Sequence, residues 1–231
     1  MTLKLTFYGH AALGLEVDGY QLLVDPYLKG NPSASIKSTE VKADYILVTH
    51  GHGDHLGDTI DIAKRTGAPV ITVVEIADWL EKRGVKTYAQ QLGGGHSYPF
   101  GYLKLTLAIH GSALPDGSYG GNPAGFLLTT KAGEKIYLAG DTGLFGDMRL
   151  IGEEGIDIAV LPIGDNYTMG PVDALRAVKL LTPRYVIPIH YNTFDLIKQD
   201  ARAWKDQVEA KTTAKVAVLK PGDSFEIPEA G

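Results

Sequence analysis

Short apolar and β-branched runs recur along the chain, and each ends abruptly in glycine, proline or a polar stretch. Such runs are typical of strands inside a core and not of a helical bundle. We therefore predict strands at residues 3–7, 21–24, 45–48, 70–73, 103–109, 124–130, 135–138, 157–161, 185–189 and 215–219.

Apolar residues at helical spacing alternate with some of these strands. They predict helices at residues 59–65, 76–82, 171–181 and 194–209. Pro171 suits a first helical position, where its missing N–H needs no partner, and we place the start of that helix near Thr168. Strand–helix alternation in both halves predicts an α+β fold in which two mixed sheets pack together with helices outside.

The sequence indicates one domain spanning residues 1–231, because it contains no repeat, no low-complexity segment and no linker. The most loop-like stretch is 31–38. Residues 93–100 and 112–122 are expected to form connecting or functional loops. His96, which follows three glycines, is expected to be a solvated loop residue.

Composition excludes several kinds of site and partner. The chain has no cysteine, so disulfides and thiol nucleophiles are excluded and every metal ligand must be nitrogen or oxygen. A net charge of -5 with dispersed Lys and Arg gives no reason to expect nucleic-acid binding. No apolar run approaches the roughly 20 residues that cross a bilayer. Residues 1–10 alternate like a strand and not like a signal peptide, so we expect a cytoplasmic protein without membrane association.

Four potential metal ligands fall within six residues, directly after the predicted strand 45–48. In this HGHGDH segment His50 and His52 lie two residues apart, so on an extended chain they project to the same side and can share one metal. The glycines between them free the backbone to turn, which lets Asp54 and His55 reach a second ion. Four titratable groups packed together without a counterion would cost solvation, so a metal role is favoured.

Three further candidates follow predicted strands in the same way: His110 after 103–109, Asp141 after 135–138 and His190 after 185–189. A strand that ends in a ligand is a rigid mount, and several converging strand ends make an open polar site at one edge of a β core. A lone histidine more often has a structural role than a metal-binding one. Because the HGHGDH cluster indicates a metal site, however, we also consider these three residues to be candidate metal ligands.

The order of these motifs resembles the metallo-β-lactamase superfamily: HGHGDH, a histidine after a strand, GDT, and another histidine after a strand. FYGHA at 7–11, YLAGDTG at 137–143 and LPIGDNYTMGP at 161–171 resemble one branch of it, the uncharacterised metal-dependent hydrolases similar to ascorbate-phosphate lactonases. That branch is more distantly similar to the phospholipase D type that cleaves N-acyl phosphatidylethanolamines. The resemblance implies a four-layer αββα sandwich.

The same resemblance implies how the ligands divide between two divalent metal ions, zinc first and manganese, nickel or iron as alternatives. His50, His52 and His110 would hold one ion, Asp54, His55 and His190 the other, and Asp141 would bridge them. Asp141 stands where many antibiotic-degrading relatives have cysteine, which makes β-lactam hydrolysis an unsuitable task for this chain.

The implied chemistry is hydrolysis of a small ester, lactone, thioester or phosphodiester by a metal-bridging hydroxide. We expect Asp54 to accept the proton of the water. His10, in the FYGHA motif, is expected to lie near the metals, where it orients a ligand or contacts substrate. The alternative for His10 is a purely structural hydrogen bond. The start of the helix at Pro171 is expected either to bind an anionic group of the substrate or to be an ordinary capped helix.

Three other functions remain open at this stage. A nucleic-acid phosphodiesterase uses the same kind of site, but the chain leaves little room for the extra domain or arm of such enzymes. A metal-binding protein without turnover is disfavoured by retention of Asp54 and Asp141. A di-iron redox role is disfavoured because such relatives have glutamate at the position of His52. A homo-oligomer is compatible with the sequence.

Overall fold

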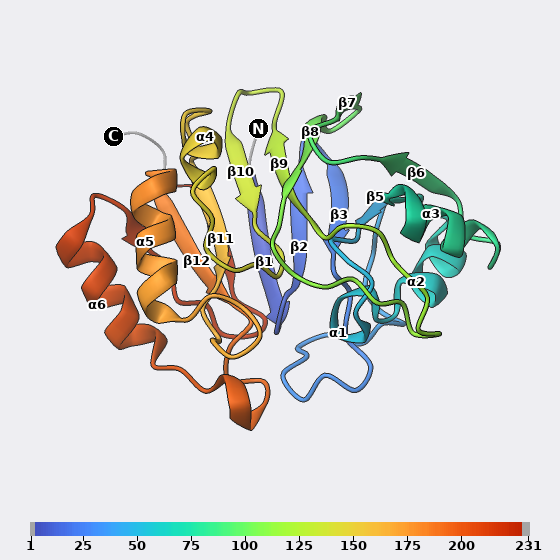
Figure 1. Ribbon diagram of the computed structural model, residues 1–231. Coiled ribbons are helices and arrows are strands. Elements are labelled where there is room, and N and C mark those ends of the chain that lie inside the picture. The colour runs from blue at the N-terminus through green and yellow to red at the C-terminus, as the bar shows by residue number, and fades with distance from the viewer. Residues whose placement is uncertain (1–2, 228–231) are drawn as a thin grey trace.

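The computed structural model describes residues 3–227, which form two seven-stranded mixed sheets packed face to face (Figure 1). In the first sheet the strands follow the order β14 (Ser224–Glu226), β1 (Lys4–Gly9), β2 (Ala12–Val17), β3 (Tyr20–Val24), β4 (Tyr45–Leu47), β5 (Val70–Val73) and β6 (Thr87–Gln90). In the second the order is β13 (Lys215–Val216), β12 (Tyr185–Ile189), β11 (Ile158–Pro162), β10 (Lys135–Leu138), β9 (Ala124–Thr129), β8 (Gly101–Leu107) and β7 (Gly95–Tyr98).

Helices cover the outer faces of both sheets (Figure 1). On the first sheet lie α2 (Thr59–Thr66) and α3 (Val74–Glu81), and on the second lie α4 (Met148–Gly152), α5 (Pro171–Leu181) and α6 (Ala201–Lys211). The short α1 (Gly53–Leu56) and a 3-10 turn (Asp195–Ile197) complete the set. The predicted four-layer αββα sandwich of two mixed sheets is confirmed. No helix in the described part of the chain is long and apolar enough to cross a membrane.

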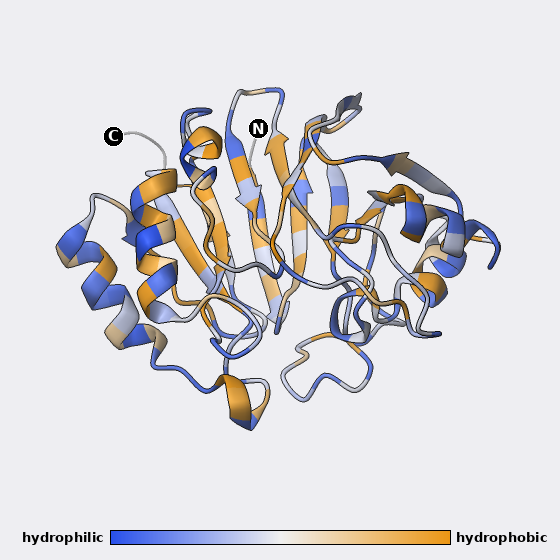
Figure 2. Cartoon of the chain, viewed as in Figure 1, coloured by the Kyte–Doolittle hydropathy of each residue, from blue (hydrophilic) through white to orange (hydrophobic). Residues whose placement is uncertain are grey.

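Two apolar clusters hold the layers together. The larger one joins the facing sides of the two sheets, and it includes Leu5, Leu15, Ile46 and Phe126, all fully buried. The smaller one joins the second sheet to its helices through residues such as Trp204. Figure 2 shows the basis of this layering. The central strands β9 and β11 are apolar along most of their length because both of their faces are covered, and α5 and α6 each have an apolar and a polar face.

Strand direction brings the carboxyl ends of six strands to one edge of the sandwich. β1 and β3 both pair antiparallel with β2, and β4 pairs parallel with β3, so β1, β3 and β4 run the same way. By the same reasoning β8, β10 and β12 share one direction in the second sheet. Their ends are followed by His10, Asp25, His50, His110, Asp141 and His190.

Most predicted strands are present within two residues of their predicted ends, but four strands were not predicted: β2, β6, β7 and β14. The 103–109 strand starts and ends two residues earlier, and the 215–219 strand is only two residues long. The sequences of β2 and β7 explain why these strands were not predicted. β2 contains a glycine and a glutamate, and β7 reads GHSY with three exposed positions. The expectation that His96 lies in a loop is wrong, since this exposed residue belongs to β7.

Helix boundaries also differ from prediction, and α3 begins at Val74, two residues before its predicted start. α5 begins at Pro171 with Gly170 as its cap, not near Thr168. The helix predicted at 194–209 is interrupted, because Asp200 caps α6 by accepting hydrogen bonds from Arg202 N and Ala203 N. An aspartate at this position satisfies N–H groups that have no partner within the helix, so the helix starts after it.

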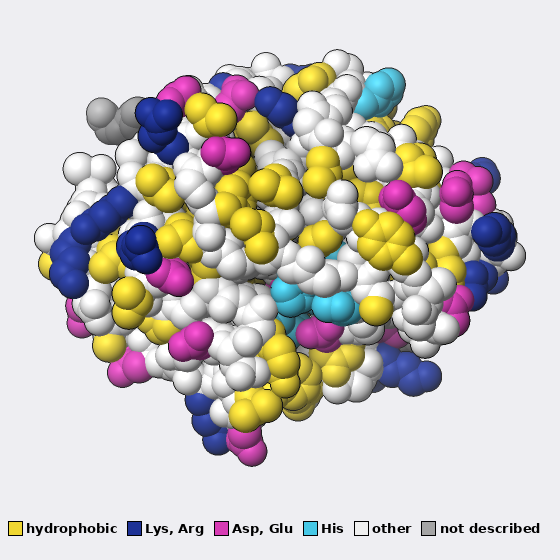
Figure 3. Space-filling model, viewed as in Figure 1, with side chains coloured by type: hydrophobic (Ala, Val, Ile, Leu, Met, Phe, Trp, Pro, Cys, Tyr) yellow, Lys and Arg dark blue, Asp and Glu magenta, His cyan; other side chains and the backbone are white. Residues whose placement is uncertain are grey.

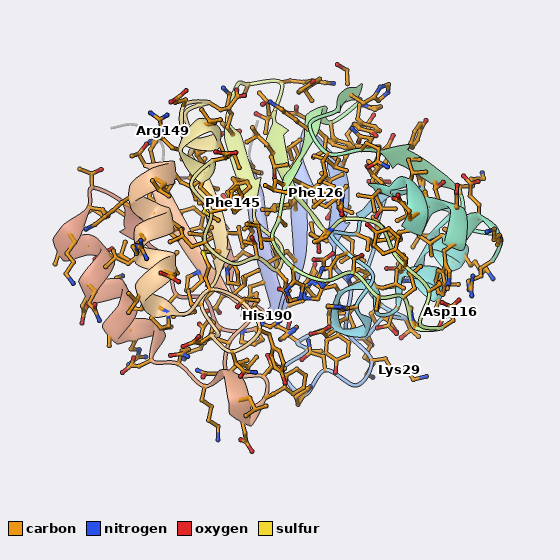
Figure 4. The ribbon with its side chains drawn as sticks, in the orientation of Figure 1. Lys29, Asp116, Phe126, Phe145, Arg149 and His190 are labelled. Atoms are coloured by element: carbon orange, nitrogen blue, oxygen red, sulfur yellow. The ribbon has the colours of Figure 1, made fainter. Side chains whose placement is uncertain are left out.

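Phe126 of β9, labelled in Figure 4, is expected to be a major contributor to stability because it fills the space between the sheets. Phe126→Ala should lower the free energy of unfolding by about 3–5 kcal/mol through lost burial and a residual cavity. Urea unfolding measures this value. Leu150→Ala, at a position 53% exposed, is the control and should change the free energy of unfolding by less than about 0.5 kcal/mol. Equal effects of the two changes would contradict the inter-sheet role.

Candidate metal centre

The HGHGDH segment changes from strand to helix within six residues. β4 ends before His50, and α1 opens at Gly53 with His52 as its cap, so that His55 N and Leu56 N both donate to His52 O. A helical turn, and not only a flexible loop, therefore carries Asp54 and His55. Gly57 ends this turn at φ 39°, where a Cβ would lie 2.6 Å from the backbone of Tyr27, so only glycine fits.

The other candidates come from three loops of the second sheet. His190 has φ 55° directly after β12, and its N–H donates to His10 O at 2.8 Å, which ties the end of one sheet to the end of the other. Asp141 and His190 are both buried. The Thr142 hydroxyl accepts a hydrogen bond from Ile109 N at 2.9 Å and so fixes the loop of Asp141 against that of His110.

His50, His52 and His110 form one compact group. His52 Nδ1 lies 3.0 Å from His50 Nε2 and 3.2 Å from His110 Nε2. Three nitrogens that share a tetrahedral ion at bond lengths near 2.1 Å are separated by roughly 3.3 Å, so this spacing suits a single cation.

Asp141 connects this group to a second one. Its carboxylate lies 3.3 Å from His55 Nε2, 3.1 Å from His190 Nε2 and 3.6 Å from His110 Nε2. Asp54 Oδ2 lies 3.7 Å from His190 Nε2, and Asp54, His55 and His190 gather with His10 so that one ligand atom of each is within 4.8 Å of the others. The seven predicted ligands thus converge in one place.

His10 lies between Asp54 and Thr193. Its Nε2 is 3.1 Å from Asp54 Oδ2 and its Nδ1 is 2.9 Å from Thr193 Oγ1. Burial lowers the pKa of His10 to about 4 despite the hydrogen bond with Asp54, so the ring is neutral at pH 7. A carboxylate accepts only, so Nε2–H donates to Asp54 and Nδ1 accepts from the Thr193 hydroxyl. This arrangement holds the carboxylate of Asp54 in one orientation.

Asp25, which follows β3, was not among the predicted site residues. Its buried carboxylate accepts hydrogen bonds from Thr49 N and Thr49 Oγ1 and lies 2.8 Å from His55 Nδ1. Thr49 Oγ1 is in turn 3.0 Å from His50 Nδ1. The available signal was an Asp-Pro pair at a strand end, the same place at which the predicted ligands occur.

The hydrogen bonds of Asp25 and Thr49 decide which ring nitrogens face the centre. His55 Nδ1 donates to Asp25, and His50 Nδ1 donates to the Thr49 hydroxyl, whose proton is given to Asp25. In their neutral forms both rings then present an Nε2 lone pair, as a metal ligand must. His55 Nε2, His190 Nε2 and Asp141 Oδ1 are buried and have no hydrogen-bond partner among the described residues, so the donor set fits a cation.

The pKa values of the buried histidines and aspartates depend on the opposite charges that lie close together in the centre. Burial opposes charge on Asp141, but His55 and His190 outweigh it and hold the pKa of Asp141 well below its usual range. Burial acts to lower the pKa of His55, whereas Asp141 and Asp25 raise it well above the usual value. His190 is affected in the same way, and Asp141 raises its pKa to about 9. For His50, burial and the charge of His55 lower the pKa well below its usual value.

The centre reaches solvent on one side. In Figure 3 histidine side chains come to the surface side by side next to an acidic side chain, and Figure 4 shows His190 at the strand ends below them. The Asp54 side chain is 33% exposed and that of His110 is 14% exposed, whereas those of His10 and His55 are fully buried. A small molecule therefore approaches from the side of Asp54, His52 and His110.

The start of α5 does not look like the anion site considered from the sequence. Asp165 lies beside Gly170, and a Cβ there would be 2.8 Å from Asp165 Oδ2. A carboxylate already occupies the space at this helix start, and it would repel a second anion. The capped-helix alternative describes this end, with Gly170 as the cap.

Comparisons with known proteins agree with this architecture. A family model described as "Beta-lactamase superfamily domain" matches residues 20–191. A UPF0173 metal-dependent hydrolase of Desulforamulus reducens is 51% identical over 230 residues, which cover 97% of this chain and 100% of the relative. One of Pelotomaculum thermopropionicum is 49% identical, with the same coverage. The solved structure of Igni18, a metallo hydrolase of Ignicoccus hospitalis, superposes with a TM-score of 0.90 at 37% identity over 100% of both chains.

Asp25→Asn is expected to weaken metal binding by about 10–100-fold. The amide replaces one accepting oxygen by a donating NH2 group, so it cannot accept from Thr49 N, Thr49 Oγ1 and His55 Nδ1 at the same time. Metal affinity can be measured by competition with a chromogenic chelator. The matched control is Asp44→Asn, which alters a carboxylate that accepts from Gln21 N at the opposite ends of the strands. Unchanged affinity in a folded Asp25→Asn variant would contradict the orienting role.

Metal binding should also depend on pH. With a pKa of about 9, His190 carries a proton at pH 7 in the metal-free protein, and a metal can bind only the neutral ring. Binding at pH 7 should therefore release roughly one proton or more, and apparent affinity should rise as the pH increases toward 9. Calorimetric titrations in buffers of different ionisation enthalpy count the protons. No proton release at pH 7 would show that His190 does not take part.

Proposed function

Because the chain belongs to the UPF0173 metal-dependent hydrolases of the beta-lactamase superfamily, we propose that it binds two divalent cations and hydrolyses a small ester, lactone, thioester or phosphodiester. The observation that carries the proposal is the convergence of six strand ends on two ligand groups joined by Asp141. Zinc is the first expectation, and manganese, nickel or iron suit the same nitrogen and oxygen ligands.

The distances support the proposed division of ligands between the two ions. His50, His52 and His110 would hold one ion, and Asp54, His55 and His190 would hold the other. The carboxylate of Asp141 lies near members of both groups and would be shared. When bound, such ions supply Lewis acidity that makes water a nucleophile at neutral pH and polarises the substrate oxygen.

The protein's own groups have separate tasks in this proposal. Asp54 is the most exposed of the carboxylates in the centre. Burial acts to raise its pKa, but the hydrogen bond from His10 and the nearby ring of His190 keep the pKa below the usual value. It is therefore ionised, and it accepts the proton of the attacking water. His10 is a positioning residue, because its ring orients Asp54 and is itself oriented by Thr193.

The proposed substrate is a small molecule because the ligands at the mouth of the centre are only partly exposed and the others are buried. The ligands at that mouth, Asp54, His52 and His110, come from α1 and from the loops after β4 and β8. We also propose a cytoplasmic location. The range of esters and related bonds is kept broad because the fold by itself does not fix specificity.

The test is metal content and turnover measured together. The wild-type protein should contain about two metals per chain and turn over at least one member of a panel of a generic phosphodiester, lactones and thioesters. His50→Ala/Asp141→Ala should lose metal and turnover, because it removes one ligand of the first group and the carboxylate shared by the two groups. His96→Ala is the control, since it removes an exposed imidazole of β7. Failure of the wild-type to bind any of the four metals after reconstitution would refute the proposal.

A further inference from the structure

A cavity of about 860 Å³ lies next to the metal centre, and apart from His10 none of its lining residues belongs to the ligand groups. It is bounded by Phe7 of β1, by residues 191–202 between β12 and α6, and by residues 218–221. Figure 1 shows the second of these segments below the sheets, in orange and red. The volume is typical of pockets that hold small organic molecules.

Three cations line this cavity: Lys198, Arg202 and Lys220. Lys198 pairs with Asp195 at 2.7 Å, whereas the side-chain nitrogens of Arg202 and Lys220 have no ion pair with a described carboxylate within 4.0 Å. The nearby carboxylates of Asp200 and Asp223 accept from the backbone N–H groups of Arg202 and Lys220 instead. The one acidic residue of the lining, Asp200, is engaged as the cap of α6. Two of the three cationic side chains, Arg202 and Lys220, are therefore not held in an ion pair and can bind an anion in the cavity.

Part of the remaining wall is apolar, and its amide side chains are hydrogen-bonded within the protein. Phe7, Val218, Leu219 and Pro221 contribute apolar surface. The polar amides of the lining are used within the protein, because Asn192 Oδ1 accepts from Gln199 N at 2.8 Å and Gln199 Nε2 donates to Gly164 O at 3.0 Å. The pocket thus offers an apolar wall and a cationic rim, a combination that complements an apolar body bearing an anionic end.

We propose that this cavity binds a small organic anion, with its phosphate or carboxylate end on Arg202 and Lys220 and its apolar body against Phe7 and Val218. The site is distinct from the hydrolytic centre and stands whether or not that centre turns over substrate. Guanidinium and ammonium groups form charge-assisted hydrogen bonds with both kinds of anion, and the planar guanidinium can engage two oxygens at once.

Calorimetric titration of the full-length protein with phenylphosphonate tests the proposal, because this probe joins an apolar ring to a non-hydrolysable phosphate-like group. Benzoate separates carboxylate from phosphate-like ligands, and inorganic phosphate shows the contribution of the apolar body. Arg202→Gln/Lys220→Gln should weaken phenylphosphonate binding about tenfold or more. Lys64→Gln/Lys82→Gln makes the same change of net charge on exposed positions of α2 and at the end of α3, and it should bind like wild-type.

Removal of metal with a chelator distinguishes this site from the metal centre. Phenylphosphonate binding that persists without metal and is lost in the Arg202/Lys220 variant supports the proposal. Binding that disappears with the metal, or that is unaffected by the two substitutions, places the anion elsewhere and overturns it. The absence of saturable binding in the millimolar range overturns it as well. None of these outcomes depends on turnover, so a failed search for substrate leaves the test intact.

Discussion

The buried carboxylate of Asp25 connects three elements on which the metal centre depends. It accepts hydrogen bonds from the backbone and hydroxyl of Thr49, after β4, and it holds His55 of α1 at 2.8 Å. Through the Thr49 hydroxyl it also determines the orientation of His50. A carboxylate that is only 1% exposed is costly to bury unless its oxygens accept hydrogen bonds. The same hydrogen bonds that offset this cost therefore also fix the orientation of the ligands.

The two sheets share the construction of the centre. The first sheet supplies His10 and the HGHGDH segment, and the second supplies His110, Asp141 and His190. The hydrogen bond from His190 N to His10 O joins their ends directly. Because the apolar cluster between the sheets fixes their separation, packing far from the site determines whether the two sets of ligands meet.

His10 contributes to the geometry of the centre although its side chain does not reach solvent. Its side chain is fully buried, and it lies in contact with Asp54 on one nitrogen and with Thr193 on the other. Thr193 belongs to the segment that also lines the neighbouring cavity through Tyr191, Asn192 and Lys198. The metal centre and the cavity therefore share one connecting segment, although the ligand atoms and the cationic rim are different groups.

The sequence alone predicted the class of fold and seven candidate ligands. Apolar runs indicated ten of the fourteen described strands, and histidines and aspartates after them indicated the candidate ligands, because strand pattern and ligand chemistry are local properties. Tertiary structure decided which nitrogens face the centre, that Asp25 and Thr193 orient its residues, and that Arg202 and Lys220 line one cavity. These depend on contacts between residues as far apart as His10 and Thr193, and only the folded sheets bring such residues together.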